Sequence, residues 1–291
     1  MFSEENAAAG VTFARGFKAA GVKAGIKKSG NLDLAMIYTE KEASVAGVFT
    51  QNAVAAAPVI VSREVVKTGS AHAIVANAGC ANACTGEVGL ANAHKMAALA
   101  AEELGCKADD VLVGSTGIIG VNLPMDKLAA GIKAAAAELS EDGSKNAGNA
   151  IITTDTYSKA CSTEVEIGGK AVRFGAIAKG SGMIQPNMAT MLCYITTDAN
   201  ISSQLMQKAL SEIVEVTFNM ISVDGDMSTN DTVLVLANGE SGMAEIKADT
   251  PEYDKFCEVL GNMCRELSKR IAADGEGATK FLTINVHGTK T

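Results

Sequence analysis

The sequence predicts a mixed α/β protein, and three observations support this. Its 291 residues suffice for two domains or one large α/β unit. Hydrophobic residues make up 47% and charged residues 20%, a composition typical of a packed globular chain rather than a disordered one. Short apolar runs bounded by Gly, Asn, Asp or Ser alternate with longer segments of helical periodicity, so strands and helices are expected throughout.

The elements of the first part of the chain follow from these patterns. An Ala-rich segment over residues 86–104 has apolar side chains at helical spacing and predicts a helix. A second helix is expected after Pro124, and a Gly168-Gly169 turn separates two strand-like runs. Short apolar runs predict strands at residues 34–38, 45–50, 58–62, 73–76 and 111–114.

The same alternation continues beyond residue 190. The segment 252–272 has an apolar stripe at helical spacing, which is typical of a core-facing helix rather than of a cofactor site. A second helix is predicted over residues 203–217. Strands are predicted at residues 191–196, 232–237 and 281–286.

Charge and composition argue against several classes of protein. The formal net charge is −8 without a basic stripe, so no nucleic-acid partner is expected. The longest apolar stretch is nine residues, 53–61, and contains Pro58, so no membrane span is expected. The acidic start does not look like a secretory signal, and seven cysteines suggest reduced thiols, so we expect a cytoplasmic protein.

Residues 179–192 form the least ordinary segment, with Gly, Ser, Pro and Asn ahead of Thr190 at the start of a strand. If the Ala189 carbonyl faces the Thr190 hydroxyl in a strained turn, an N-to-O acyl shift can cut the peptide bond. Thr190 would then carry a free α-amine that acts as base for its own hydroxyl. The alternative is an ordinary β-branched strand residue after a long loop.

Such acyl chemistry needs a site for an oxyanion, and residues 113–120 are a candidate. Three glycines allow backbone N–H groups to converge, and the Thr116 hydroxyl adds a side-chain donor. The segment could instead bind a phosphate, although no Gly-Lys-[Ser/Thr] follows it, or simply connect a strand to a turn.

Two further segments carry polar groups in unusual settings. Thr153-Thr154-Asp155-Thr156 follows an apolar run, and its plainer interpretation is an N-cap or an Asx turn. Glu276 lies between two glycines just past the long helix, in a position that otherwise indicates a helix C-cap.

The sequence gives little support for a metal site. Residues 224–231 resemble a calcium loop but lack Gly at its sixth position and Glu at its twelfth. Cys80, Cys84 and His94 lack a fourth ligand for zinc. No metal or cofactor is therefore expected.

Taken together, these segments resemble the bifunctional glutamate N-acetyltransferase, or ornithine acetyltransferase, family of arginine biosynthesis. The resemblance runs along nearly the whole chain in an ordered series of blocks and is more specific than any single motif. The blocks are residues 16–21, 25–30, 46–50, 81–86, 115–120, 153–156, 179–192, 221–226, 228–232 and 274–280.

The resemblance implies a layered α/β sandwich that cleaves itself between Ala189 and Thr190. The products would be an α fragment, residues 1–189, and a β fragment, residues 190–291, assembling as an α2β2 heterotetramer. Thr190 would be the nucleophile, and Thr116 and Gly117 would stabilise the oxyanion. The positions implied to bind substrate are Thr153, Lys179, Thr190 and Glu276.

The implied reaction moves the acetyl group of N2-acetyl-L-ornithine to L-glutamate through an acetyl-Thr190 intermediate. Some relatives also accept acetyl-CoA, and the sequence does not decide between one donor and two. The alternatives are an N-terminal-nucleophile amidohydrolase or aminopeptidase, which gives the acyl group to water, and an inactive homologue that acts as a binding partner.

The chain departs from the family pattern in two places. Ser158 stands where relatives usually have Pro, a change expected to be tolerated in a surface loop. Similar enzymes continue past a strand like residues 281–286 into a segment with a further Asn and Thr at the substrate site. Because this chain stops at Thr291, we expect a fragment, or an enzyme with part of its pocket missing.

Overall fold

The computed structural model describes residues 9–186 and 191–288, and their strands form one hydrogen-bonded network. The strand order is β4-β3-β2-β8-β7-β6-β5, with β1 paired to β2. The strands are β1 (Phe17–Val22), β2 (Leu34–Phe49), β3 (Ser70–Cys80), β4 (Val111–Ile118), β5 (Lys159–Ile167), β6 (Lys170–Lys179), β7 (Leu192–Thr197) and β8 (Thr232–Ala237).

The long strand β2 divides this network into two halves. Its first part pairs with β1 and β3, and its last part pairs with β8, with a register irregularity between Tyr38 and Ala43. The bend lets β1–β4 face β5–β8 across a buried cluster that includes Ile37 and Ile74 from one half and Tyr194 and Leu234 from the other. The two runs expected at residues 34–38 and 45–50 are thus parts of one strand.

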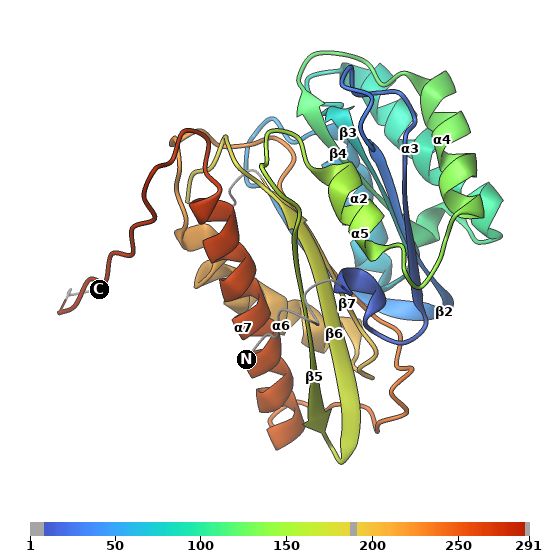
Figure 1. The fold of residues 1–291 in the computed structure, drawn as a ribbon. Coiled ribbons are helices and arrows are strands. Elements are labelled where there is room, and N and C mark those ends of the chain that lie inside the picture. The colour runs from blue at the N-terminus through green and yellow to red at the C-terminus, as the bar shows by residue number, and fades with distance from the viewer. Residues whose placement is uncertain (1–8, 187–190, 289–291) are drawn as a thin grey trace.

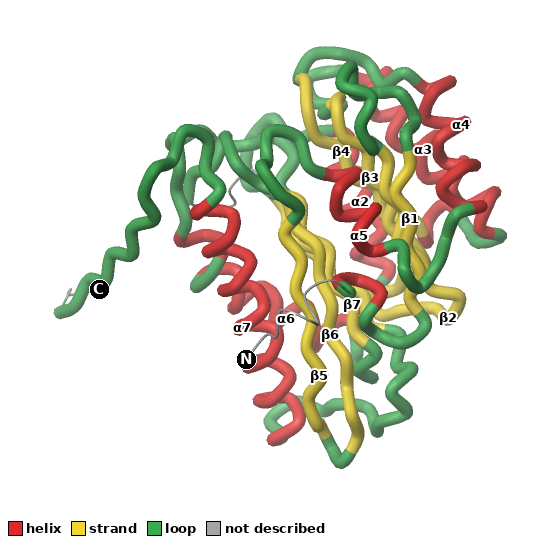
Figure 2. Tube along the Cα trace, viewed as in Figure 1, coloured by secondary structure: helices red, strands yellow, loops and turns green. Residues whose placement is uncertain are grey.

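Helices cover the outer faces of both halves (Figures 1 and 2). On one side, α3 and α4 pack on β1–β4, and on the other α6 and α7 pack on β5–β8. Side chains alternate accordingly, since Leu192 and Tyr194 face the inner cluster while Cys193 and Ile195 face α6 and α7. The helices are α2 (Ala57–Thr68), α3 (Gly86–Leu104), α4 (Met125–Ala137), α5 (Ser144–Ile151), α6 (Ser203–Glu215) and α7 (Pro251–Ala273), with short 3₁₀ turns at Gly10–Thr12, Ala108–Asp110 and Phe218–Met220.

The result is a mixed α/β sandwich, as the sequence predicts, but two predicted strands are wrong. Residues 58–62 lie in helix α2, where Pro58 stands in the first turn and Val61 and Val65 are buried one turn apart. Ile60 is exposed on the other side, so this apolar run has a helical period.

Residues 281–286 form no strand either. After α7 the described chain leads away from the body (Figure 1), and Leu282, Ile284 and Val286 are between 70% and 82% exposed. The alternating pattern of this segment is that of a strand, but no neighbouring strand in the described chain pairs with it.

Candidate active site

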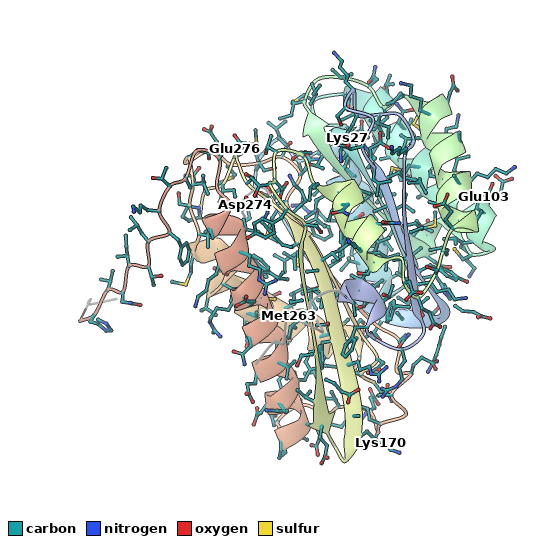
Figure 3. The ribbon with its side chains drawn as sticks, viewed as in Figure 1. Lys27, Glu103, Lys170, Met263, Asp274 and Glu276 are labelled. Carbon is teal, nitrogen blue, oxygen red and sulfur yellow. The ribbon has the colours of Figure 1, made fainter. Side chains whose placement is uncertain are left out.

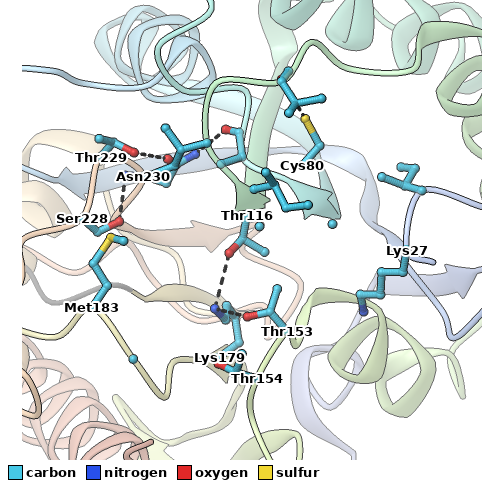
Figure 4. Close-up of a pocket in the computed structure, with 18 of the residues that line it drawn as sticks. Lys27, Cys80, Thr116, Thr153, Thr154, Lys179, Met183, Ser228, Thr229 and Asn230 are labelled. Carbon is cyan, nitrogen blue, oxygen red and sulfur yellow. Dashed lines mark hydrogen bonds between the residues drawn. The ribbon is translucent and has the colours of Figure 1, made fainter. Parts of the chain in front are cut away.

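Four strand ends meet at one edge of the sandwich. The carboxyl ends of β4 and β6 lie beside the amino ends of β7 and β8, because β6 is antiparallel to β7 and β7 is parallel to β8. A cavity of about 690 Å³ opens there (Figure 4). Its lining includes Lys27, Thr116, Gly117, Thr153, Lys179, Gly182, Ser228, Asn230 and Glu276.

Thr116 and Gly117 lie at the end of β4, which continues past Gly114 to Ile118 instead of turning. Thr116 is 6% exposed. Gly117 has a φ of +129°, and a Cβ there would lie 2.5 Å from the Gly79 carbonyl carbon. The close approach of β3 to β4 therefore requires glycine at position 117.

Lys179, the last residue of β6, forms hydrogen bonds with two other residues singled out from the sequence. Its ammonium donates to the Thr153 hydroxyl at 2.9 Å and to the Thr116 hydroxyl at 3.4 Å (Figure 4). The side chain is 3% exposed, and burial lowers its pKa from the usual value, although the Asp155 carboxylate 3.9 Å away opposes the shift.

A buried ion network lies behind Lys179, and the sequence pattern predicts no role for two of its members, Lys159 and Asp274. The Lys159 ammonium lies 2.8 Å from an oxygen of Asp155 and 2.6 Å from one of Asp274. Burial acts to raise the pKa of Asp155, but Lys179 and Lys159 outweigh it, and the pKa lies below its usual value. Asp155 also accepts from the Gly180 N–H at 2.6 Å.

The network joins three segments that are distant in sequence. Asp274, just past α7, accepts from the Thr156 N–H at 3.0 Å and from the Thr156 hydroxyl. The Asp274 carbonyl accepts from the Ser181 hydroxyl at 2.6 Å. The end of α7 is thereby held against the loops on either side of Lys179, and the N-cap or Asx interpretation of residues 153–156 misses this role.

Glu276 follows this anchored turn and lines the cavity. Its N–H donates to the Ser181 carbonyl at 2.8 Å. A Cβ on Gly182 would lie 2.5 Å from the Glu276 carboxyl carbon. The Glu276 side chain therefore packs against Gly182, where any larger residue would clash with it. Glu276 is exposed, and its charge acts on Lys179 without direct contact. In Figure 3, Glu276, Asp274 and Lys27 lie towards the same end of the molecule.

Ala189 and Thr190 lie outside the described residues, but the position just after them is defined. The Met191 N–H donates to Asp231 Oδ1 at 3.0 Å, and the Met191 carbonyl accepts from the Thr232 N–H at 3.0 Å. Asp231 is fully buried, and this burial raises its pKa to about 8.

The candidate metal motifs serve other purposes. Asp224 accepts from the N–H groups of Met183 and Ile184, so it holds the loop that follows Lys179. Cys80 is buried with its sulfur 3.1 Å from the Val121 carbonyl, whereas Cys84 is exposed. Among residues 9–186 and 191–288, no three metal-ligating side chains cluster. None of the helices there is long and apolar enough to cross a membrane.

Comparisons with known proteins connect this geometry to a family. The ArgJ family model matches residues 18–291. The arginine biosynthesis bifunctional protein ArgJ of Lactococcus lactis is 52% identical over 276 residues, which cover 94% of this chain and 68% of that protein. The protein of the same name from Symbiobacterium thermophilum is 51% identical, covering 98% of this chain and 71% of that protein.

Solved structures agree with the sequence comparisons. Ornithine acetyltransferase from Mycobacterium tuberculosis, complexed with ornithine, is 40% identical with a TM-score of 0.57, covering 63% of this chain and 96% of that chain. An L-aminopeptidase D-Ala-esterase/amidase from Ochrobactrum anthropi, described as a variant of the Ntn hydrolase fold, has a TM-score of 0.56 at 10% identity and covers 94% of this chain and 87% of its own, a likeness of fold alone. The chain therefore belongs to the ArgJ family, a family of acyltransferases of arginine biosynthesis.

Proposed function

We propose that the chain transfers the acetyl group of N2-acetyl-L-ornithine to L-glutamate through an acetyl-Thr190 intermediate. The observation that carries the proposal is the buried Lys179 ammonium, which joins the hydroxyls of Thr116 and Thr153 at the wall of the cavity. A fixed cation beside hydroxyl donors suits a substrate with a carboxylate next to an amide that becomes an oxyanion.

The nucleophile would be made by self-cleavage. The Thr190 hydroxyl attacks the Ala189 carbonyl, the C–N bond breaks, and the resulting ester is hydrolysed, leaving a free amine on Thr190. Nearly all of the M. tuberculosis chain, 96%, matches only 63% of this one, close to the share that residues 1–189 make up. A relative whose solved chain has about that size supports a fragment of this length.

In the transfer itself, the Thr190 amine takes the hydroxyl proton while the oxygen attacks the acetyl carbonyl. The Thr116 hydroxyl and the Gly117 N–H would stabilise the oxyanion. The C–N bond then breaks, and ornithine leaves with a proton. The glutamate amine attacks the acetyl ester, gives up its proton, and releases the Thr190 hydroxyl as N-acetylglutamate forms.

The residues lining the cavity match the charges of these substrates. The Lys179 ammonium suits the α-carboxylate, and the Glu276 carboxylate suits the side-chain amine of ornithine. The chemistry needs no metal or cofactor, and acetyl-CoA would act only as an additional acetyl donor. We further propose a cytoplasmic α2β2 assembly of the two fragments.

The nucleophile is tested with Thr190→Ala, and Thr283→Ala serves as a matched loss of a hydroxyl in the exposed tail. We expect intact-mass spectrometry to show two fragments for the wild type and for Thr283→Ala, and one uncut chain for Thr190→Ala. Acetyl transfer from N-acetylornithine to glutamate should disappear with the cut. A Thr190→Ala chain that is cleaved normally contradicts the assignment, and faster acetate release than transfer favours a hydrolase.

Substrate recognition is tested with Lys179→Ala and Glu276→Gln, with Lys170→Ala as the control at the far turn of the sandwich (Figure 3). Losing one charge-assisted hydrogen bond costs about 1.5 to 3 kcal/mol, or roughly 10- to 150-fold. We expect calorimetric titration to show an N-acetylornithine Kd raised by that factor in both variants and unchanged in the control. Unaltered affinity in all three would remove both residues from the substrate site.

A further inference from the structure

Asn230 connects the loop before β8 to the strand that carries Thr116. Its side-chain amide donates to the Ser115 carbonyl at 2.9 Å and to the Ala81 carbonyl at 2.7 Å. Its side-chain oxygen accepts from the Thr229 hydroxyl at 2.6 Å (Figure 4). Every hydrogen-bonding group of this amide has a partner, so its orientation and that of the peptide entering Thr116 are fixed.

Asp231, the next residue, connects the same loop to the strand that follows Thr190. One carboxyl oxygen accepts the Met191 N–H at 3.0 Å, and the other has no hydrogen bond of ordinary geometry within residues 9–186 or 191–288. The side chains of Ser228 and Thr50 act to lower the pKa of Asp231, but burial outweighs them. The side chain is fully buried, and burial keeps it largely in the neutral form at pH 7. Burying a half-paired carboxyl costs stability, so this residue is a poor choice for packing alone.

Backbone hydrogen bonds hold the loop that carries Asn230 and Asp231 in place. The Asp231 carbonyl accepts from the Thr50 N–H at 2.9 Å, and the Thr229 carbonyl accepts from the Ala56 N–H at 2.9 Å. The loop is thus attached to the end of β2 and to the start of α2, and adjacent side chains reach the two halves of the sandwich from one fixed point.

We propose that Asn230 and Asp231 are a pair of positioning residues that sets the distance between the oxyanion donors on β4 and the nucleophile ahead of β7. The inference rests on the proposed function and adds to it two residues that act through the backbone of Ser115 and Met191, although Asn230 also lines the cavity. An error of about 1 Å between a nucleophile and its oxyanion donors is enough to lower turnover roughly 100-fold.

The chain offers matched controls at the opposite ends of the same two strands. Asn238 follows β8, is buried, and donates to the Arg15 carbonyl at 2.8 Å and to the Thr39 hydroxyl at 3.2 Å. Asp198 follows β7, is fully buried, and accepts from the Arg173 N–H at 2.8 Å and from the Arg15 guanidinium at 2.6 Å. Removing these groups disturbs buried hydrogen bonds away from the cavity, and for Asp198 it also removes an ion pair, so the controls perturb the fold at least as much as the test variants do.

The experiment compares Asn230→Ala and Asp231→Ala with Asn238→Ala and Asp198→Ala in the full chain. We expect the first two to slow self-cleavage and to lower kcat of the processed enzyme 30- to 100-fold, with KM within threefold of the wild type. The controls should lose thermal stability and keep kcat. Asp231→Asn, which retains an oxygen that can accept the Met191 N–H, should restore kcat to within about fivefold.

Hydrogen exchange in the same samples gives a readout that does not depend on activity. Amides of residues 113–118 should exchange faster in Asn230→Ala, and those of residues 191–193 faster in Asp231→Ala, than in either control. If the wild type transfers acetyl groups and Asn230→Ala and Asp231→Ala have the same kcat as the controls, only the positioning role is overturned. If the wild type never transfers acetyl groups, the proposed function is overturned. In that case the positioning role is also overturned if the amides of Asn230→Ala and Asp231→Ala exchange no faster than those of the control variants.

Discussion

The free energy of unfolding of Asp231→Asn, relative to that of the wild type, should increase as the pH rises. The pKa of Asp231 is about 8 in the folded state and near 3.8 when the side chain is exposed. Between these values the folded protein holds a proton that the unfolded chain releases, so the stability of the wild type falls with increasing pH. The loss levels off above about pH 8, where both states are ionised, and is absent below about pH 4.

The magnitude follows from the same two pKa values. Each pH unit between them costs the wild type about 1.4 kcal/mol relative to a variant that cannot ionise. From pH 6 to pH 8 the advantage of Asp231→Asn should therefore grow by about 2 to 3 kcal/mol. The amide has its own cost of burial, but that cost is constant with pH, so the slope reports on Asp231.

Urea denaturation at pH 6, 7 and 8 measures this slope, in a Thr190→Ala background that we expect to remain one chain. Asp142→Asn, which removes an exposed carboxylate, is the control and should follow the wild type. A stability difference between Asp231→Asn and its parent that does not change with pH would refute the reasoning. It would mean that water or a rearranged neighbour solvates the carboxylate in the folded state.

Two further predictions concern the site. Thr116→Ala should lower the kcat of the processed enzyme about 100- to 1,000-fold with little change in KM, because one oxyanion donor is lost, and steady-state kinetics that leave kcat unchanged would remove Thr116 from the mechanism. Lys159→Met should destabilise the fold by about 3 to 5 kcal/mol, because it leaves Asp155 and Asp274 buried without their shared cation, and denaturant unfolding with an unaltered midpoint would contradict that.

Periodicity alone predicted much of the fold. The strand at residues 232–237 and the long helix at 252–272 match β8 and α7 to within a residue at each end. A short continuous apolar run indicates a strand buried on both faces, and a long period of 3.6 indicates a helix. The run 58–62 contains β-branched residues that favour a strand locally, so the sequence predicts a strand where the structure has a helix. Burial on one side of α2 decides otherwise.

The polar interior could not be predicted from spacing. Asp155 and Asp274 are 119 residues apart and share Lys159 only because β5 runs beside α7. Asn230 lies in the block 228–232 that carries the resemblance, but its role could not be predicted locally, since its partners at Ala81 and Ser115 come from the other half of the sandwich. The roles of Thr116, Gly117, Thr153, Lys179 and Glu276 stay predictions, although the structure places all five around one cavity.

The strand order has a consequence for any cut between Ala189 and Thr190. In the series β2-β8-β7-β6, the two middle strands would belong to the second fragment and the two flanking strands to the first. Each fragment would then complete the other's hydrogen-bonded ladder, so the pieces could separate only by unfolding. A cut made after the sheet has assembled would leave this ladder in place, whereas two fragments made separately would have to interleave their strands before either had a core.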